Sequence, residues 1–400
     1  MASLRWIVVL LALLVGCPSR RNVECVETSN CDLGPGGVCT PNSATGNLWC
    51  TYPDPACPSG RRWSDVDVGD GLSGRCVMEE PIAPPDGPPD APSGICVPEL
   101  LFVRGGLFTN GKVFRVNLAT FEEQRVSNEA DTDIDAEWSP DGTRIVLVRN
   151  GSSTVIVDAA GGNVHTVDTQ SGRFLLAPQW SPDGTRIAYM SIPTAGGASR
   201  IYSADVNGTV GVNLTPGFDA ANPRWSPDGT RILFTSDAPG NRDVFVMASS
   251  GAGPMNLTNR ALNDDAPRWS PDGSKIVLIQ GSRVWTMDAN GANLVALTGT
   301  VFADAAWSHD GQQIFIVRDP DGAAQLQVMN ANGTNQHPIE TDPAADREPV
   351  PSPDGSRIAW VSKRDGNFEI YVASPDGTNP TRVTNNAAPD THPRWRPCLP

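Results

Sequence analysis

One phrase returns along this chain and constrains its fold more than any other feature. It reads WSPDGTRIVLV at residue 138 and recurs with small changes at 180, 225, 269, 307 and 351, while a fragment, WRP, stands at 395. Successive copies start 42, 45, 44, 38, 44 and 44 residues apart. A period of about 40 to 45 residues indicates a repeat protein in which each unit is one small supersecondary element.

Each copy of the phrase predicts a β-hairpin. Ser-Pro-Asp-Gly suits a tight turn, because Pro fixes its own φ, Asp tolerates the next position and Gly adopts the left-handed conformation. Alternating apolar residues follow the turn, and two further β-like runs come next, such as RIYSADVNG at 200 and VNLT at 212. One repeat therefore predicts four short antiparallel strands, which is the blade of a β-propeller. The repeated Trp would supply apolar contact between blades.

The two ends of the repeat region complete each other. Residues 101–127 match the second, third and fourth strands of a blade without a preceding Trp-Ser-Pro, and residues 392–397 match a first strand with nothing after it. Six complete repeats plus this composite blade predict an all-β, seven-bladed propeller over residues 95–400. A ring closed in this way hides the sheet edges that an open array would expose.

Two cysteines flank the predicted composite blade. Aligning Trp395 with Trp180, and residues 101–104 with residues 187–190, places Cys96 and Cys398 where the hairpin turn of this blade is missing. We therefore predict a Cys96–Cys398 disulfide that replaces the turn. The alternative is that Cys96 pairs with a cysteine further upstream and Cys398 is a free thiol.

The first 16 residues predict a signal peptide, because an Arg is followed by an apolar run from Trp6 to Val15 that is short for a bilayer span. LVGC at 14–17 resembles the lipobox of bacterial lipoproteins, in which the Cys becomes the first mature residue and carries lipid. The resemblance implies lipidation of Cys17 and a place in the bacterial cell envelope. Pro18, where an Asp would favour the inner membrane, favours the outer membrane. The alternative is an ordinary signal peptide beside an unrelated cysteine.

Residues 17–78 predict a small segment stapled by disulfides. Six cysteines fall between residues 25 and 76 in a stretch rich in Gly, Pro, Asn and Ser, and outside the cytoplasm such density indicates disulfides. The sequence does not choose among the possible pairings. A zinc site is not expected, since the segment has neither a CxxC nor a His. Residues 79–94, EEPIAPPDGPPDAPSG, predict a semi-rigid linker.

Composition and motifs exclude several functions. The chain has 400 residues, a formal net charge of −15 and no basic stripe, so binding to a nucleic-acid backbone is not expected. No Gly-x-Ser-x-Gly elbow and no His-Glu-x-x-His motif occurs. The sequence therefore predicts no catalytic residues, no metal site and no cofactor.

Acidic residues recur just before the Trp position of several repeats. The fifth or third residue before it is a carboxylate at Asp133, Asp135, Asp264, Asp304, Asp346, Glu348 and Asp390. If these segments open on the channel face of the propeller, they predict an acid-lined mouth that binds a cation or a basic peptide. The alternative is that the aspartates cap tight turns by accepting hydrogen bonds from backbone N–H groups.

The Trp-Ser-Pro-Asp-Gly repeats resemble the WD-like propeller repeats of TolB, over roughly residues 97–400. A Cys-rich segment stands here where TolB has an α/β domain. Together with the lipobox, the resemblance implies a lipid-anchored scaffold of the cell envelope that binds a protein or peptide through the channel face of the propeller. The alternative is an envelope enzyme, a glycan lyase or hydrolase, that uses a pair of carboxylates at the channel mouth.

Overall fold

The computed structural model describes residues 38–41, 48–53, 61–63, 96–106, 110–128, 130–238, 240–299, 302–319, 324–340 and 345–398. The chain divides into two compact units, Met1–Pro89 and Asp90–Pro400. The predicted signal peptide, Cys17 and the linker at 79–94 lie outside the described residues. The described part of the chain is built from strands, and none of its elements is a helix long and apolar enough to cross a membrane.

The first unit contains one small antiparallel sheet in its described residues. Its strands are β1 (Val38–Pro41), β2 (Leu48–Pro53) and β3 (Arg61–Trp63), in the order β1-β2-β3. The register of the first pair sets Cys39 opposite Cys50. The disulfide pairing of this segment stays a prediction.

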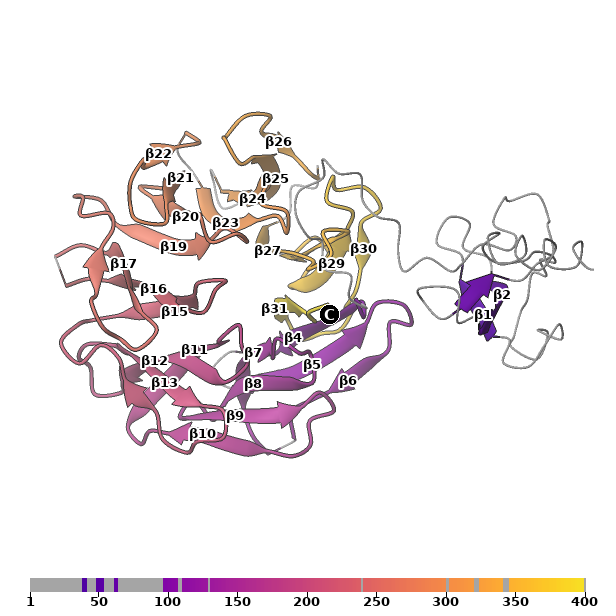
Figure 1. The fold of residues 1–400 in the computed structure, drawn as a ribbon, viewed down its shortest axis with the longest axis horizontal. Coiled ribbons are helices and arrows are strands. Elements are labelled where there is room, and N and C mark those ends of the chain that lie inside the picture. Colours follow the sequence, from indigo (N-terminus) through magenta and orange to yellow (C-terminus); the bar gives the residue numbers. More distant parts are fainter. Residues whose placement is uncertain are drawn as a thin grey trace, which may run out of the picture. The chain divides into compact units, whose positions relative to one another are not determined.

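The second unit is a propeller of seven four-stranded antiparallel sheets, arranged around a ring in Figure 1. The first strand of each sheet lies nearest the centre; these strands are β7 (Asp133–Trp138), β11 (Arg173–Trp180), β15 (Ala221–Trp225), β19 (Asp264–Trp269), β23 (Phe302–Trp307), β27 (Asp346–Pro351) and β31 (Asp390–Trp395). The second strands are β8 (Arg144–Arg149), β12 (Arg186–Pro193), β16 (Arg231–Ser236), β20 (Lys275–Gln280), β24 (Gln313–Arg318), β28 (Ile358–Ser362) and β4 (Glu99–Arg104). The third strands are β9 (Ser153–Asp158), β13 (Arg200–Asp205), β17 (Asp243–Ala248), β21 (Arg283–Asp288), β25 (Gln325–Asn330), β29 (Glu369–Ala373) and β5 (Lys112–Asn117). The fourth, outermost strands are β10 (His165–Thr169), β14 (Val212–Asn213), β18 (Met255–Asn256), β22 (Val295–Ala296), β26 (His337–Pro338), β30 (Thr381–Arg382) and β6 (Glu123–Arg125). The predicted seven-bladed fold is confirmed.

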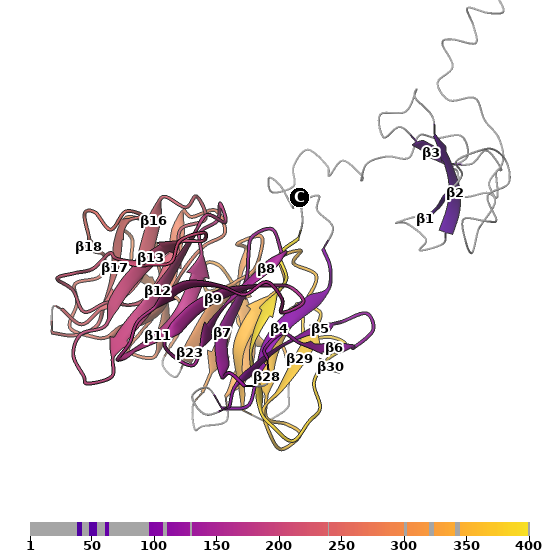
Figure 2. The same ribbon diagram turned by 90° about the horizontal axis from the view of Figure 1, so that it is seen from below.

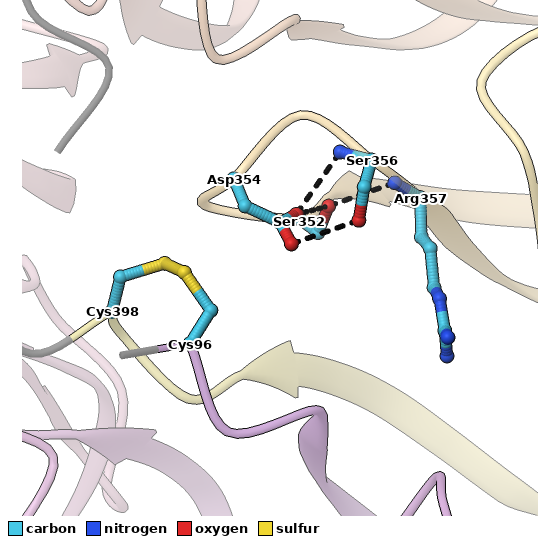
Figure 3. The surroundings of a disulfide bond; sticks show 6 residues. All are labelled: Cys96, Ser352, Asp354, Ser356, Arg357 and Cys398. Atoms are coloured by element: carbon cyan, nitrogen blue, oxygen red, sulfur yellow. Dashed lines mark hydrogen bonds between the residues drawn. A yellow bond between two sulfur atoms is a disulfide. The ribbon is translucent and has the colours of Figure 1, made fainter. Parts of the chain in front are cut away.

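The last blade is assembled from both ends of the repeat region, as predicted. Its strand order is β31-β4-β5-β6, and β31 pairs with β4 so that Trp395 lies opposite Leu100. Figure 1 shows β31 beside β4, and Figure 2 shows β4, β5 and β6 together at one side of the ring. A Cys96–Cys398 disulfide joins residues 302 positions apart, and Figure 3 shows it beside the ends of the two strands. The disulfide stands where the other blades have the turn between their first and second strands.

The repeated turn is held by its own side chains. In the turn after β27, the hydroxyl of Ser352 accepts a hydrogen bond from the backbone N of Arg357 at 2.9 Å, and the Asp354 carboxylate accepts one from the backbone N of Ser356 at 3.0 Å (Figure 3). The Ser352 hydroxyl also donates to Asp354. The same arrangement occurs in the other five complete repeats, at Ser139/Asp141, Ser181/Asp183, Ser226/Asp228, Ser270/Asp272 and Ser308/Asp310. These aspartates are therefore part of the fold.

The repeated Trp side chains connect neighbouring blades. The indole N–H of Trp225 donates to the backbone carbonyl of Gln179 in the preceding blade at 3.2 Å, and Trp269 donates likewise to Arg224 at 3.3 Å. Trp180, Trp307 and Trp395 make the equivalent bond. Buried apolar side chains fill the space between adjacent sheets, so each blade covers the face of the next.

Candidate functional site: the central channel

The first strand of most blades contains a β-bulge. We number each repeat from its Trp position (138, 180, 225, 269, 307, 351 and 395), which is position 0. Six blades shift register between positions −4 and −1, and the residue at position −3 has a positive φ, for example 50° at Asp135 and 49° at Ala177. In the exception, β23, the register shifts earlier, between Phe302 and Asp304. Because a one-residue shift reverses which face a side chain occupies, the bulge separates position −5 from position −1.

The carboxylates at position −5 lie inside the blades. Asp133, Asp264, Asp346 and Asp390 each have an exposed fraction of 0%. Asp133 accepts two hydrogen bonds of 2.9 Å from Arg149, its partner across the β7–β8 pair, and Asp390 accepts two of 2.9 Å from Arg104. These four carboxylates do not form the exposed mouth that the sequence suggested, because the bulge turns them to the sheet face that carries the Trp.

The carboxylates at position −3 are partly exposed, but two of them bond the backbone of the next blade. Asp135 accepts a hydrogen bond from the backbone N of Ala177 at 3.1 Å, and Glu348 accepts one from the backbone N of His392 at 2.8 Å. Asp304 pairs with Arg268 at 3.2 Å. In the described residues no group of three or more His, Cys, Asp or Glu is placed to hold a metal ion. That any of the seven predicted acids binds a ligand stays a prediction.

Position −1 supplies the polar lining of the channel, which the sequence reasoning missed. A cavity of about 480 Å³ lies among the inner strands. The described residues that line it include Glu137, Gln179, Arg224, Arg268 and Arg394, all at position −1 of their blades. The remaining two blades place Ala306 and Val350 there. Pro and Ser residues of the repeated turns form the rest of the wall. The available signal was the residue before each Trp, which changes from blade to blade while the residues after it repeat.

Burial and the neighbouring charges shift the pKa values of two residues in this cavity. Burial, together with the positive charges of Arg268 and Arg394, lowers the pKa of Arg224 to about 10. Burial raises the pKa of Glu137 to about 7, against the opposing effect of the positive charges of Arg224 and Arg394 and a hydrogen bond of 2.6 Å from Gln179. Glu137 and Arg224 both line the cavity and are partly exposed in it. Three cations thus share the cavity with one carboxylate.

A second buried cluster lies at the start of β27. Burial and the neighbouring Glu340 carboxylate raise the pKa of Asp346. Arg364 lies between the two acids, hydrogen-bonded to Glu340 and 3.5 Å from Asp346. Asp346 is fully buried, and neither acid lines the channel cavity.

Seven antiparallel four-stranded sheets around a central channel define this protein as a β-propeller. The chain belongs to the PD40 family, the TolB beta propeller domain, whose model matches residues 149–349 and 284–398. No curated protein matches the sequence.

Solved structures share the fold at low sequence identity. TolB from Acinetobacter baumannii is 19% identical, over 75% of this chain and 67% of that chain, with a TM-score of 0.50. An oligogalacturonate lyase in complex with manganese is 17% identical, over 70% of this chain and 88% of that chain, with a TM-score of 0.59. A puromycin-hydrolyzing peptidase of Mycobacterium tuberculosis is 14% identical, over 71% of this chain and 51% of that chain, with a TM-score of 0.58.

Proposed function

We propose that this protein is a binding scaffold of the bacterial cell envelope, anchored by lipid at Cys17, whose channel face engages a protein or peptide. The observation that carries the proposal is the contrast between repeated and variable positions. The Ser and Asp of the six complete repeats and the Trp of five blades are occupied by bonds that hold the fold, whereas position −1 differs between blades and faces the cavity. A variable polar lining on a rigid framework is the usual design of a binding site.

The envelope location rests on the LVGC sequence at 14–17 and on membership of the TolB propeller family. Pro18 favours the outer membrane. Radiolabelled palmitate should enter the intact protein and should not enter a Cys17→Ser variant. Equal labelling of the two proteins would rule out the lipid anchor.

Binding is tested by capture from envelope extracts. The anchored protein should retain a partner, and replacement of Arg224 and Arg394 by Gln should reduce its recovery while the thermal melt is unchanged. The acids at position −3 are tested in the same way with Asp135→Asn and Glu348→Gln, which preserve an acceptor oxygen for the neighbouring backbone N–H. Undiminished recovery with every variant would place the binding surface away from the channel.

The second candidate function is an envelope enzyme, a glycan lyase or hydrolase. The observation in its favour is the Asp346–Glu340 pair, because a carboxyl group with a raised pKa can act as a general acid. Its complete burial argues against contact with a substrate. Cleavage of an envelope glycan by the intact protein, lost in Asp346→Asn with the melt unchanged, would make the enzyme the better account.

A further inference from the structure

Arg224, Arg268 and Arg394 line one cavity, and their guanidinium groups make few hydrogen bonds or ion pairs with the described residues. The backbone carbonyl of Arg224 accepts a hydrogen bond from Trp269, but the Arg224 guanidinium makes neither a hydrogen bond nor an ion pair with any residue that the structure describes. The Arg268 Nε is buried without a hydrogen-bond partner, although its Nη2 lies 3.2 Å from Asp304. Arg394 donates to the carbonyl of its own neighbour, Pro393, at 2.9 Å. All three side chains are partly exposed in the cavity, and the described residues compensate their positive charges only in part, so the cavity attracts negative charge.

The surrounding acids only partly supply that charge. Glu137 is the carboxylate among the described residues that line the cavity, and Asp304 approaches Arg268 from one side. At position −1, the other blades carry either an arginine, Arg224 or Arg394, or an uncharged residue. The cavity is therefore locally positive in a chain whose formal net charge is −15.

We propose that Arg224, Arg268 and Arg394 form a binding site for a carboxylate carried by an extended peptide segment of the partner protein. The proposal rests on the binding function proposed above and names the chemistry of that ligand. The planar fork of a guanidinium matches a carboxylate with two parallel hydrogen bonds, and two or three such forks around one cavity fix both its place and its orientation. The carboxylate belongs either to a C-terminus or to an acidic side chain.

The wall of the cavity and the charge of the chain favour a peptide over other anions. Pro182, Pro227 and Pro271 line the cavity beside the arginines, which gives a peptide an apolar surface to pack against. Trp180 and Trp225 also line the cavity, but their exposed fractions are only 5% and 9%. The guanidiniums of Arg144 and Arg186 lie over the two rings, so neither offers an open face to a sugar. A polyanion such as a nucleic acid would be repelled by the acidic chain, whereas a single carboxylate meets only the local positive field.

Glu137 makes the site sensitive to pH. A bound carboxylate competes with the Glu137 carboxylate for Arg224 and Arg394, so binding favours the protonated form of Glu137. Since the pKa of Glu137 is raised to about 7, affinity should increase by up to about tenfold between pH 8 and pH 6. The other titratable groups that face this part of the channel are Arg224, Arg268, Arg394 and His309, with Asp135, Asp304 and His392 at the next level. A Glu137→Gln variant separates the contribution of Glu137 from that of the histidines, because it should bind more tightly at pH 8 and lose most of the pH dependence.

Three matched sets of immobilised tetrapeptides test the proposal. The first set has free C-terminal carboxylates and no acidic side chain, the second has amidated ends and a central Glu, and the third has amidated ends and a central Gln. The full protein should be retained by the first or the second set at least about tenfold more strongly than by the third. The set that retains it identifies the source of the carboxylate.

Variants identify the site. Arg224→Gln and Arg394→Gln should each weaken retention by about tenfold, and Arg283→Gln, a change at an exposed arginine of β21, should have no effect. Circular dichroism and the thermal melt check that each variant is folded. Equal retention by all three sets, or retention that the channel variants do not reduce, would overturn the proposal.

Two further outcomes separate this inference from the function on which it rests. If the protein captures an envelope partner but prefers none of the carboxylate peptides, the scaffold function stands and the carboxylate site is wrong. If it binds an oligogalacturonate in preference to every peptide, the arginines recognise a glycan and the proposal of a peptide ligand fails.

Discussion

Charged residues occur at both ends of the first strand in the ring, but those at position −5 and those at position −1 lie in different surroundings. At position −5, Asp133 is fully buried and makes two hydrogen bonds with Arg149 across the β7–β8 pair. At position −1, the Arg224 guanidinium lies in the channel cavity without a hydrogen bond or ion pair among the described residues. The Asp133 charge is paired inside the fold, and the Arg224 charge is available to a ligand. Asp264 and Asp346, also at position −5, are buried but keep carboxylate oxygens without a hydrogen-bond partner among the described residues. Burial inside a blade, and not pairing alone, thus distinguishes the acids that build the propeller from the charges that its channel can use.

Among the residues that build the propeller, removal of the Cys96–Cys398 disulfide should have the largest effect on the unfolding free energy. A Cys96→Ser/Cys398→Ser double variant should lose about 4 kcal/mol of unfolding free energy, because the disulfide restrains a loop of almost the whole propeller in the unfolded chain. Urea unfolding measures the loss. Cys398→Ser alone should lose nearly as much, since either change removes the same bond. An unchanged unfolding free energy, or a peptide map that links Cys96 to an upstream cysteine, would contradict this account of ring closure.

Replacement of a buried acid at position −5 should have the next largest effect on the unfolding free energy. Asp133→Asn should lower the unfolding free energy by about 3 kcal/mol, because it leaves the Arg149 guanidinium without its buried carboxylate. Asp135→Asn is the matched control two residues away, and it should cost less than about 1 kcal/mol, since the amide oxygen can still accept from Ala177. If the control is the more damaging change, position −3 holds the ring together and position −5 does not.

Replacement of a repeated Trp should have a smaller effect on the unfolding free energy, and two Trp positions can be compared with each other. Trp225→Phe removes a hydrogen bond to the Gln179 carbonyl, whereas the Trp138 Nε1 has no partner among the described residues. Both changes remove a similar apolar volume, so Trp225→Phe should cost about 1 kcal/mol more than Trp138→Phe. Thermal unfolding of the two variants measures the difference. Equal losses would mean that the repeated Trp acts through packing alone.

The repeat made the fold readable from the sequence, down to the composite blade and its disulfide. A fixed period reports both what each unit contains and what the incomplete unit lacks, so Cys96 and Cys398 could be placed at the missing turn. Two aspects of the channel were less accessible. The acids were expected on segments that open on the channel face, but they lie within the first strand, where the bulge at position −3 turns position −5 away from the channel. Pro at position −2, as in Pro178 and Pro223, was the available sign of this bulge, because a strand proline favours an edge or a bulge. The convergence of three arginines depends on the curvature of the whole ring, which no local pattern contains.

The central claim is that the charges at position −1 serve a ligand and not the fold. Urea unfolding of Arg224→Gln, measured beside Asp133→Asn, tests it most directly. Arg224→Gln should leave the unfolding free energy unchanged or raise it by up to about 1 kcal/mol, because it removes a partly desolvated charge that Arg268 and Arg394 repel. A loss comparable to that of Asp133→Asn would show that Arg224 is part of the framework and would contradict the account.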